Sequence, residues 1–331
     1  RARGDRVALG IGVCCYVEVT GFGRKEFGAV EIGADGVVSV RVGTTSTGQG
    51  HETAFAQLAA SALGVPIERV RVLQSDTALV ARGEGSYGSR TLQVGGTAVH
   101  EATASVLAKA RQIAAHELEV ALEDVEVLDG GGIGVVGAPE RALGWPELVE
   151  AAADPARLPE GMTPGLAAES RAFLREYTYP FGTHVAVVEV DLDTGDARLV
   201  RHVSVDDCGR VMNPMLVRGQ IHGGLGQGIA QALYEGVEFD GSGTPLTSTL
   251  ATYAMPAATE LPSFEASSTE TPTPVNPLGV KGVGESATIG STPAVLNAVV
   301  DALSFLGVRH LDLPLTPERV WRAAREPLLS P

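Results

Sequence analysis

The chain has 331 residues, of which 44% are hydrophobic, so it is long enough to bury a sizeable core in one large domain or two ordinary ones. Its net charge of -15 argues against a nucleic-acid or anionic-membrane partner, because both need a basic patch on the protein. The same charge is what plain solubility requires, so it carries no further functional meaning by itself.

Three cysteines, Cys14, Cys15 and Cys208, do not form the pattern of a disulfide framework. Cys14 and Cys15 are adjacent and lack the spacing of a metal site. This cysteine usage favours a reducing, cytoplasmic compartment. The N-terminal residues do not resemble a signal peptide, and we expect no apolar run that spans a bilayer. The chain begins at Arg1 without a Met, which is compatible with processing, a fragment boundary or a subunit cut from a longer ancestor.

The first half alternates hairpin, helix and strand signals. Alternating apolar residues around a turn at Ala34-Asp35-Gly36 predict a hairpin over residues 27–43. Apolar residues at helical spacing predict a helix over residues 51–63. A short strand follows over about residues 70–74.

A second helix and strand come next. An alanine-rich segment predicts a long helix over residues 92–118, followed by a short strand over residues 125–128. Residues 59–73 align with residues 114–128, and both copies have the pattern helix, turn, strand. Such repeated units beside hairpins predict an α+β fold with two similar layered subdomains.

Glycines and prolines interrupt the periodicity over residues 129–175. We interpret this segment as a surface excursion with one short helix over residues 145–153. The sequence thus predicts a first subdomain over residues 1–137, a connecting excursion over residues 138–175, and a second subdomain over residues 176–331.

The second half opens as the first does, with a predicted hairpin. Its strands are residues 185–190 and 197–205, around a turn at residues 193–196. A glycine-rich stretch over residues 219–228 then enters a helix through Glu235. Near the end of the chain, Ser291-Thr292-Pro293 predicts a helix start, because a hydroxyl cap precedes a proline in the first turn. We expect this helix to end near Phe305.

Gly48-Gln49-Gly50-His51-Glu52-Thr53 places glycines around an amide just before a helix. Such a turn lets the backbone approach a ligand, and the helix N-terminus offers free N–H groups to it. Gln49 can both donate and accept, which suits the edge of a heterocycle or an oxo group. The alternative is a glycine turn with a polar cap. His51 and Glu52 are adjacent rather than four residues apart, which argues against a zinc site.

A second glycine-rich loop, residues 83–90, also precedes a helix but lacks the Gly-Lys-Ser/Thr ending of a Walker motif. Its backbone N–H groups and Ser89 are suited to a phosphate, and Arg90 is suited to a bidentate pair with one. The alternative is a loop that packs two elements together. Further on, Asn213-Pro214 predicts a turn, and Gln220 adds another amide beside a glycine.

Glu285 lies in the glycine-rich loop Gly279–Ser286, outside any periodic solvent face. In a buried pocket, with Lys281 nearby in sequence, such a carboxylate suits a general base. The alternative is a structural carboxylate that accepts backbone N–H bonds.

Taken in order, these motifs resemble the C-terminal half of the molybdopterin-binding subunit of the xanthine dehydrogenase, aldehyde oxidase and aerobic carbon monoxide dehydrogenase family. Each motif is weak alone, whereas five in order over nearly the whole chain are strong. The matching segments are Gly48–Thr53, Gly85–Arg90, Asn213-Pro214 with Gly219-Gln220, Lys281–Glu285 and Leu313–Trp321.

The resemblance implies hydroxylation of a carbon centre (an aldehyde, an N-heterocycle, a purine or CO) with water as the oxygen source, and it assigns the general base to Glu285. It implies molybdopterin, in bacteria usually the cytosine dinucleotide, with molybdenum held through the pterin dithiolene rather than by a ligand from this chain. The implied cofactor-binding residues are Gln49, Gly50, His51, Glu52, Thr53, Gly88, Ser89, Arg90, Asn213, Gln220, Lys281, Gly282, Val283 and Gly284.

The earlier half of that family's subunit supplies a further glutamine, a Gly-Gly-Phe-Gly-type loop and the substrate-selecting loop, and none of these is found in this sequence. We therefore expect an N-terminal half on a separate chain, or a fragment of a longer one. FAD and a 2Fe–2S cluster are expected on partner subunits, since no cluster-type cysteine pattern is present here. The alternative is a non-catalytic scaffold or assembly subunit that does not bind the cofactor by itself.

Overall fold

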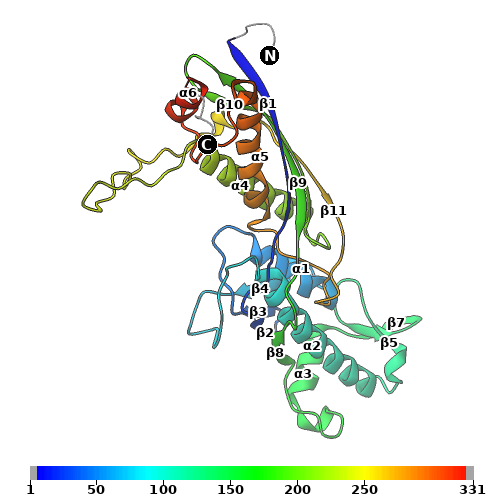
Figure 1. Ribbon diagram of the computed structural model, residues 1–331. Coiled ribbons are helices and arrows are strands. Elements are labelled where there is room, and N and C mark those ends of the chain that lie inside the picture. The colour runs from blue at the N-terminus through cyan, green and yellow to red at the C-terminus, as the bar shows by residue number, and fades with distance from the viewer. Residues whose placement is uncertain (1–5, 326–331) are drawn as a thin grey trace. The chain divides into compact units, whose positions relative to one another are not determined.

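The computed structural model describes residues 6–325, which form two compact units (Figure 1). Within the described residues, unit 1 comprises residues 6–19, 179–272 and 283–325, and unit 2 comprises residues 20–178 and 273–282. Each unit is interrupted in sequence by the other, because strands from distant parts of the chain pair within it.

These units depart from the predicted division at residues 137 and 175. The first strand, β1 (Val7–Val17), pairs antiparallel with β9 (Phe181–Asp191) and therefore belongs with the second half of the chain. Residues 138–175 are not a connecting excursion, because β8 (Ala167–Phe173) extends the sheet of unit 2. The helix predicted there, α3 (Trp145–Ala153), is confirmed, and it buries Trp145 and Leu148 in the core of unit 2.

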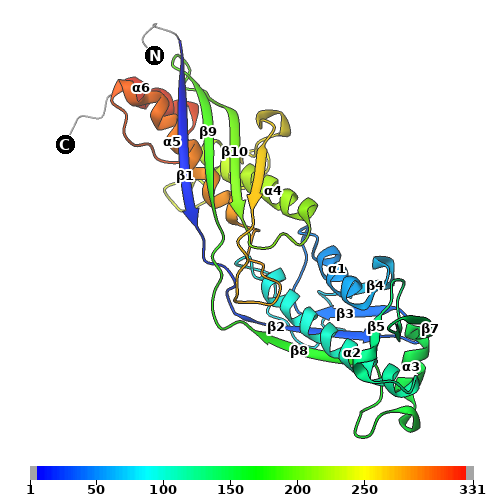
Figure 2. The ribbon, with the colours of Figure 1, turned by 90° about the vertical axis from the view of Figure 1, so that its right-hand side faces the viewer.

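Unit 2 is built on a four-stranded sheet with the order β4-β3-β2-β8. Two helices, α1 (His51–Leu63) and α2 (Gly96–Glu117), lie on one face of it (Figure 2). The predicted hairpin and both predicted helices are confirmed. The remaining strands of this sheet are β2 (Lys25–Ile32), β3 (Val38–Val42) and β4 (Val70–Leu73).

The predicted repeat of helix, turn and strand is also confirmed, but the two copies have different partners. After α1, β4 pairs parallel with β3 in the main sheet. After α2, β5 (Val125–Val127) instead joins a small sheet with β6 (Ile133–Val135) and β7 (Ala138–Leu143).

Unit 1 has the same layering as unit 2, and two helices alternate with three of its strands in the same order. Its edge strand β1 comes first in the sequence, whereas β8 of unit 2 comes last. Its sheet has the order β1-β9-β10-β11, in which β10 pairs antiparallel with β9 and parallel with β11, as β3 does with β2 and β4. The hairpin predicted at its start is confirmed. Its other elements are β10 (Ala197–Asp207), α4 (Pro214–Leu233), β11 (Glu265–Thr269), α5 (Ser286–Leu303) and α6 (Pro317–Arg325). Two similar α+β subdomains are therefore present, as predicted.

The start of α4 corrects two predictions. Asn213 is its N-cap and accepts a hydrogen bond from the backbone N–H of Leu216 at 3.1 Å, so Asn213-Pro214 opens a helix rather than forming a free turn. The glycine-rich stretch lies inside α4. Tertiary packing outweighs the helix-breaking tendency of glycine here, because a Cβ on Gly228 would lie 2.0 Å from Ser291 Oγ on α5.

The last long helix begins earlier than predicted. Helix α5 begins at Ser286 and contains Pro293, so Ser291 is an interior residue whose hydroxyl donates to the carbonyl of Thr288. By length and composition, residues 286–306 are apolar enough to span a membrane. The sequence by itself predicts no such run. This helix packs on β1, β9 and α4, and half of the segment is buried, so a core position accounts for its apolar character.

Contact between α5 and β1 is made at glycines. A Cβ on Gly12 would lie 2.0 Å from the carbonyl oxygen of Ala294, and Gly10 meets Ala298 in the same way. One edge N–H group of β1 is also hydrogen-bonded to this helix, because Asp301 accepts from the N–H of Ile11 at 2.9 Å.

We expect Gly12→Ala to destabilise unit 1 by about 1–3 kcal/mol or more, because the added methyl group overlaps backbone atoms of α5 that cannot rotate away. Gly223→Ala is the matched control, since a Cβ there meets nothing within 4 Å on α4. This control is expected to be neutral or stabilising by up to about 1 kcal/mol. Thermal unfolding of the two purified variants measures the difference, and equal melting temperatures would contradict the packing argument.

Candidate functional site

The predicted site segments occupy equivalent positions in the two units. Gly48–Thr53 lies between β3 and α1, and Asn213 lies at the corresponding place between β10 and α4. Gly88–Arg90 precedes α2, and Glu285 immediately precedes α5, which is the corresponding helix. All four segments therefore stand at helix N-termini, where backbone N–H groups lack intrahelical partners.

The turn before α1 presents backbone and amide donors. Gly48 and Gly50 have φ values of 108° and 73°, the left-handed region that favours glycine. Gly50 is the N-cap of α1 and provides no side-chain cap. Gln49 Oε1 accepts a hydrogen bond from Thr47 N at 2.6 Å, which leaves its Nε2 as the donor end of the amide.

His51 and Glu52 at the start of α1 have distinct charge states. His51 Nδ1 lies 3.1 Å from the carbonyl oxygen of Thr45, so Nδ1 carries the proton and Nε2 is the acceptor. Burial lowers the pKa of His51 and favours this neutral form. Hydrogen bonds from its own backbone N–H and then from Gln74 hold the pKa of Glu52 below its ordinary value. This end of α1 therefore combines a neutral imidazole with a carboxylate that is held against its own helix.

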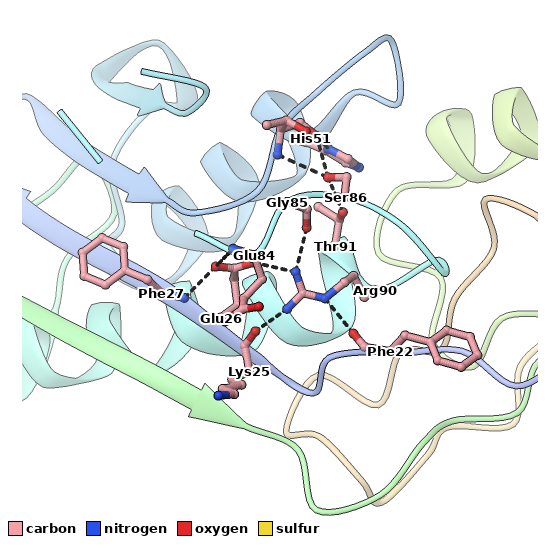
Figure 3. Close-up of polar contacts among 11 residues, drawn as sticks. Phe22, Lys25, Glu26, Phe27, His51, Glu84, Gly85, Ser86, Arg90 and Thr91 are labelled. Carbon is pink, nitrogen blue, oxygen red and sulfur yellow. Dashed lines mark hydrogen bonds and ion pairs between the residues drawn. The ribbon is translucent and has the colours of Figure 1, made fainter. Parts of the chain in front are cut away.

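Arg90 does not point at a ligand, contrary to the prediction of a bidentate phosphate contact. Its side chain is fully buried and forms a salt bridge with Glu26 at 2.6 Å (Figure 3). The guanidinium also donates to backbone carbonyl oxygens, which belong to Phe22, Lys25 and Gly85. Four of its N–H groups are thus used inside unit 2, and Arg90 braces the loop instead of binding from it.

Two residues outside the predicted site connect the glycine-rich segments of unit 2. Ser86 Oγ donates to the carbonyl oxygen of Thr45 at 2.6 Å and accepts from its N–H at 3.2 Å (Figure 3). Because the same carbonyl contacts His51, Ser86 ties the loop before α2 to the turn before α1. Ser86 belongs to the recognised Gly85–Arg90 motif, but its partner Thr45 has no signal in the sequence.

The segment that leads to Glu285 also packs against this region of unit 2. A Cβ on Gly282 would lie 2.6 Å from Ser89 Cβ, and Gly282 N donates to Thr20 Oγ1 at 3.3 Å. Gln93 Nε2 donates to both Thr20 Oγ1 and the carbonyl of Ser89. Two predicted segments that are almost 200 residues apart in sequence are thus in direct contact.

Unit 1 holds Asn213, Gln220, Val283, Gly284 and Glu285, whereas Lys281 belongs to unit 2. Asn213 caps α4, so its side-chain oxygen is engaged with the helix, and Gln220 lies two turns further along, partly buried. Val283 and Gly284 connect to Glu285, which is exposed at the N-cap of α5. The backbone carbonyl of Glu285 accepts from the N–H groups of Thr288 and Ile289, which fixes its main chain.

We expect Arg90→Met to lower the free energy of unfolding by about 3–5 kcal/mol, because it leaves the Glu26 carboxylate buried without its cation. Arg198→Met is the control, since its ion pair with Glu189 is exposed and is worth at most about 1 kcal/mol. The two values come from urea unfolding monitored by circular dichroism. A loss below 1 kcal/mol for Arg90→Met would exclude the brace.

A duplicated α+β unit with donor-rich turns at its helix starts is suited to binding a polar cofactor. The chain belongs to the family described as the molybdopterin cofactor-binding domain, whose model matches residues 1–262. Among the 320 residues from 6 to 325, no group of three or more His, Cys, Asp or Glu side chains is placed to hold a metal ion.

Relatives of known activity match the chain along most of its length. It is 40% identical over 330 residues to the carbon monoxide dehydrogenase large chain of Hydrogenophaga pseudoflava, an alignment that covers 96% of this chain and 41% of the relative. It is 37% identical to the 6-hydroxypseudooxynicotine dehydrogenase complex subunit gamma of Paenarthrobacter nicotinovorans, covering 97% and 40%. The chain thus spans about two fifths of the length of these relatives.

Solved structures give the same result. Quinoline 2-oxidoreductase from Pseudomonas putida 86 is similar with a TM-score of 0.91 and 37% identity, covering 98% of this chain and 43% of that one. A Cu,Mo-CO dehydrogenase in its carbon monoxide reduced state is similar with a TM-score of 0.90 and 36% identity, covering 97% and 42%.

Proposed function

We propose that this chain is the C-terminal, molybdopterin-binding part of a molybdenum hydroxylase, with Glu285 as the general base. The observation that carries the proposal is the placement of Glu285, whose carboxylate is exposed while its backbone is fixed by the first turn of α5. A base must reach its proton in a reproducible geometry, and an anchored but accessible carboxylate meets that need. Membership of the family and the names of the relatives support the same reaction class.

The residues of unit 2 fit a molybdopterin dinucleotide. The uncapped start of α1 offers backbone N–H groups to phosphate or pterin oxygens, over Gly50 to Thr53. Gln49 Nε2 and His51 Nε2 add one donor and one acceptor for the edge of a heterocycle. A Cβ on Gly48 meets nothing within 4 Å, so the turn is open at its outer side.

Other segments complete the proposed cofactor shell. We assign Gly88 and Ser89 to the same cofactor, on a loop that Arg90 holds in place. From unit 1, we assign Gln220 to the pterin and Val283–Gly284 to the approach of the loop that carries Glu285. When bound, the molybdenum centre supplies oxygen transfer from water to an electron-poor carbon and accepts the electrons released. Glu285 removes the proton from the attacking oxygen.

We further propose that another polypeptide segment completes the active site. The outward face of β1 is apolar, with the side chains of Leu9, Ile11, Val13 and Val17 between 50% and 70% exposed. Such a strip favours burial against protein, and the relatives are more than twice as long as this chain. We assign this apolar strip to contact with the N-terminal half of the subunit. FAD and 2Fe–2S subunits are the further partners of a cytoplasmic complex.

The substrate is an aldehyde, an N-heterocycle, a purine or CO.

In the assembled complex, we expect Glu285→Gln to lower kcat by about 10²–10⁴-fold, because an amide cannot accept the proton. Molybdenum content should stay at the wild-type level, since the substitution removes a proton acceptor and not a cofactor contact. Steady-state kinetics and elemental analysis of the same preparation measure both quantities. Turnover within a few-fold of wild type, with the metal retained, excludes Glu285 as the base.

We expect Gln49→Leu to weaken cofactor retention about five-fold, the equivalent of one hydrogen bond of about 1 kcal/mol. Gln112→Leu on the exposed side of α2 is the matched control. Molybdenum per mole of protein after extended dialysis measures the effect. If the wild-type complex contains no molybdenum at all, a scaffold subunit is the better description of this chain.

A further inference from the structure

A row of polar side chains lies on the buried face of the unit 1 sheet, at the end near the start of α5. The strand register aligns Tyr16 on β1, Gly182 on β9 and Asp206 on β10. The adjacent row contains His184 and Ser204, and the next one contains His202. All of these side chains are at most 8% exposed, so the row is an interruption of an otherwise apolar core.

Hydrogen bonds connect this row across the three strands. Tyr16 Oη donates to Asp206 Oδ1 at 2.6 Å, and His184 Nε2 donates to the same oxygen at 3.0 Å. The row continues from His184 Nδ1, which lies 3.3 Å from His202 Nε2. Burial raises the pKa of Tyr16 and lowers the pKa of His202 to about 4, so both groups are neutral at neutral pH.

Glycines make room for the row. A Cβ on Gly182 would lie 2.7 Å from Asp206 Oδ1, and a Cβ on Gly290 would lie 2.7 Å from the ring of His184. Gly290 belongs to α5, so the imidazole packs directly under that helix. Glycines on two elements are needed to accommodate these polar side chains, so the polar row is an integral part of this core.

Ser286 connects the row to the candidate general base. It is the first residue of α5, directly follows Glu285 and is 1% exposed. Its hydroxyl donates to Glu18 Oε2 at 2.7 Å and also interacts with the Tyr16 phenol. Glu18, at the end of β1 and 8% exposed, therefore anchors the residue on which the backbone of Glu285 depends.

We propose that Glu18 is a positioning residue for Glu285: it holds Ser286 at the start of α5, and it does so as a buried, neutral carboxyl group. The proposal rests on the assignment of Glu285 under Proposed function. Burial penalises the charged form of a carboxyl group, so a buried carboxyl group without a cation beside it favours the neutral form.

The surroundings of Glu18 support a neutral carboxyl group at this position. Burial raises the pKa of Glu18, and the charge of Glu285 raises it further, against the hydrogen bond from Ser286. The titratable groups that face this end of the row are Glu285 from α5, Tyr16 from β1, His184 from β9 and Asp206 from β10. No cation is among them, so nothing in this set favours an ionised Glu18 over a neutral one.

A stability measurement tests the proton on Glu18 independently of activity. Because its pKa is raised on folding, Glu18 contributes stability that is full below the ordinary glutamate pKa and is lost as the pH rises through the folded-state value. The melting temperature of wild type minus that of Glu18→Gln should therefore fall with rising pH. The control Glu126→Gln, at an exposed position of β5, should give a flat difference. A flat difference for Glu18→Gln as well would overturn the proposal.

Infrared spectroscopy provides a second readout of the same proton. The carbonyl band of a protonated carboxylic acid should persist to a higher pH in wild type and in Glu285→Gln than in Glu18→Gln. A band that disappears in Glu285→Gln and persists in Glu18→Gln would place the proton on the wrong partner and overturn the proposal.

Kinetics of the assembled complex then test positioning. Glu18→Ala should lower kcat about ten-fold with KM within two-fold, and Glu18→Gln should recover most of the loss, because a neutral amide still accepts from Ser286. Ser286→Ala removes the same hydrogen bond with a smaller change, and its kcat should match that of Glu18→Ala. It therefore keeps the test valid if Glu18→Ala does not fold. Loss in Glu18→Gln equal to that in Glu18→Ala, or no loss in any variant, overturns the proposal. An active Glu285→Gln overturns instead the assignment of the base, and the stability and infrared results still locate the proton.

Discussion

Unit 1 depends on the direct contact between the backbone of α5 and strand β1. Gly10 and Gly12 make this contact possible, because any side chain at either position would overlap carbonyl oxygens of the helix. Since α5 begins at Ser286, the contact also determines where Glu285 stands on this unit. The closeness of helix and strand encloses Tyr16, Glu18 and the polar row behind them in a dry layer, where a hydrogen bond is stronger and an extra charge is costly.

In unit 2, a buried ion pair positions the loop before the corresponding helix, α2. Arg90 joins its own loop, through Gly85, to the segment Phe22–Glu26, so this ion pair and its hydrogen bonds hold the shape of the loop before α2. Removing one partner of such a pair is costly, although the pair itself contributes little net stability, so its role here is to specify one loop conformation. Ser86 connects this loop to the turn before α1, because its hydroxyl group is hydrogen-bonded to the backbone of Thr45. The donors of Gln49 and of the α1 N-terminus are thereby held in a fixed arrangement.

The duplicated architecture explains why the candidate residues are scattered along the chain. Each unit presents the starts of two helices, and each start carries a glycine-rich turn, an amide or a carboxylate. Helix starts provide unpaired donors at no cost to the core, so a large polar cofactor can be bound without burying unsatisfied groups. The chain accounts for about two fifths of the length of its relatives, and the exposed apolar side of β1 marks where unit 1 has surface to bury.

Local patterns in the sequence predicted most helices and strands, the α+β class and the order of the motifs, because periodicity and turn residues act over short distances. They singled out Glu285 and Gln49 as candidates, because both stand beside glycines in short motifs. They misplaced the starts of α4 and α5, where packing between Gly228 and Ser291 overrides local propensity. Only the tertiary structure assigned β1 to unit 1, turned Arg90 inward to Glu26 and brought Glu18 to Ser286, 268 residues away. Those outcomes depend on strand pairing and burial between distant segments, which no short window of sequence contains.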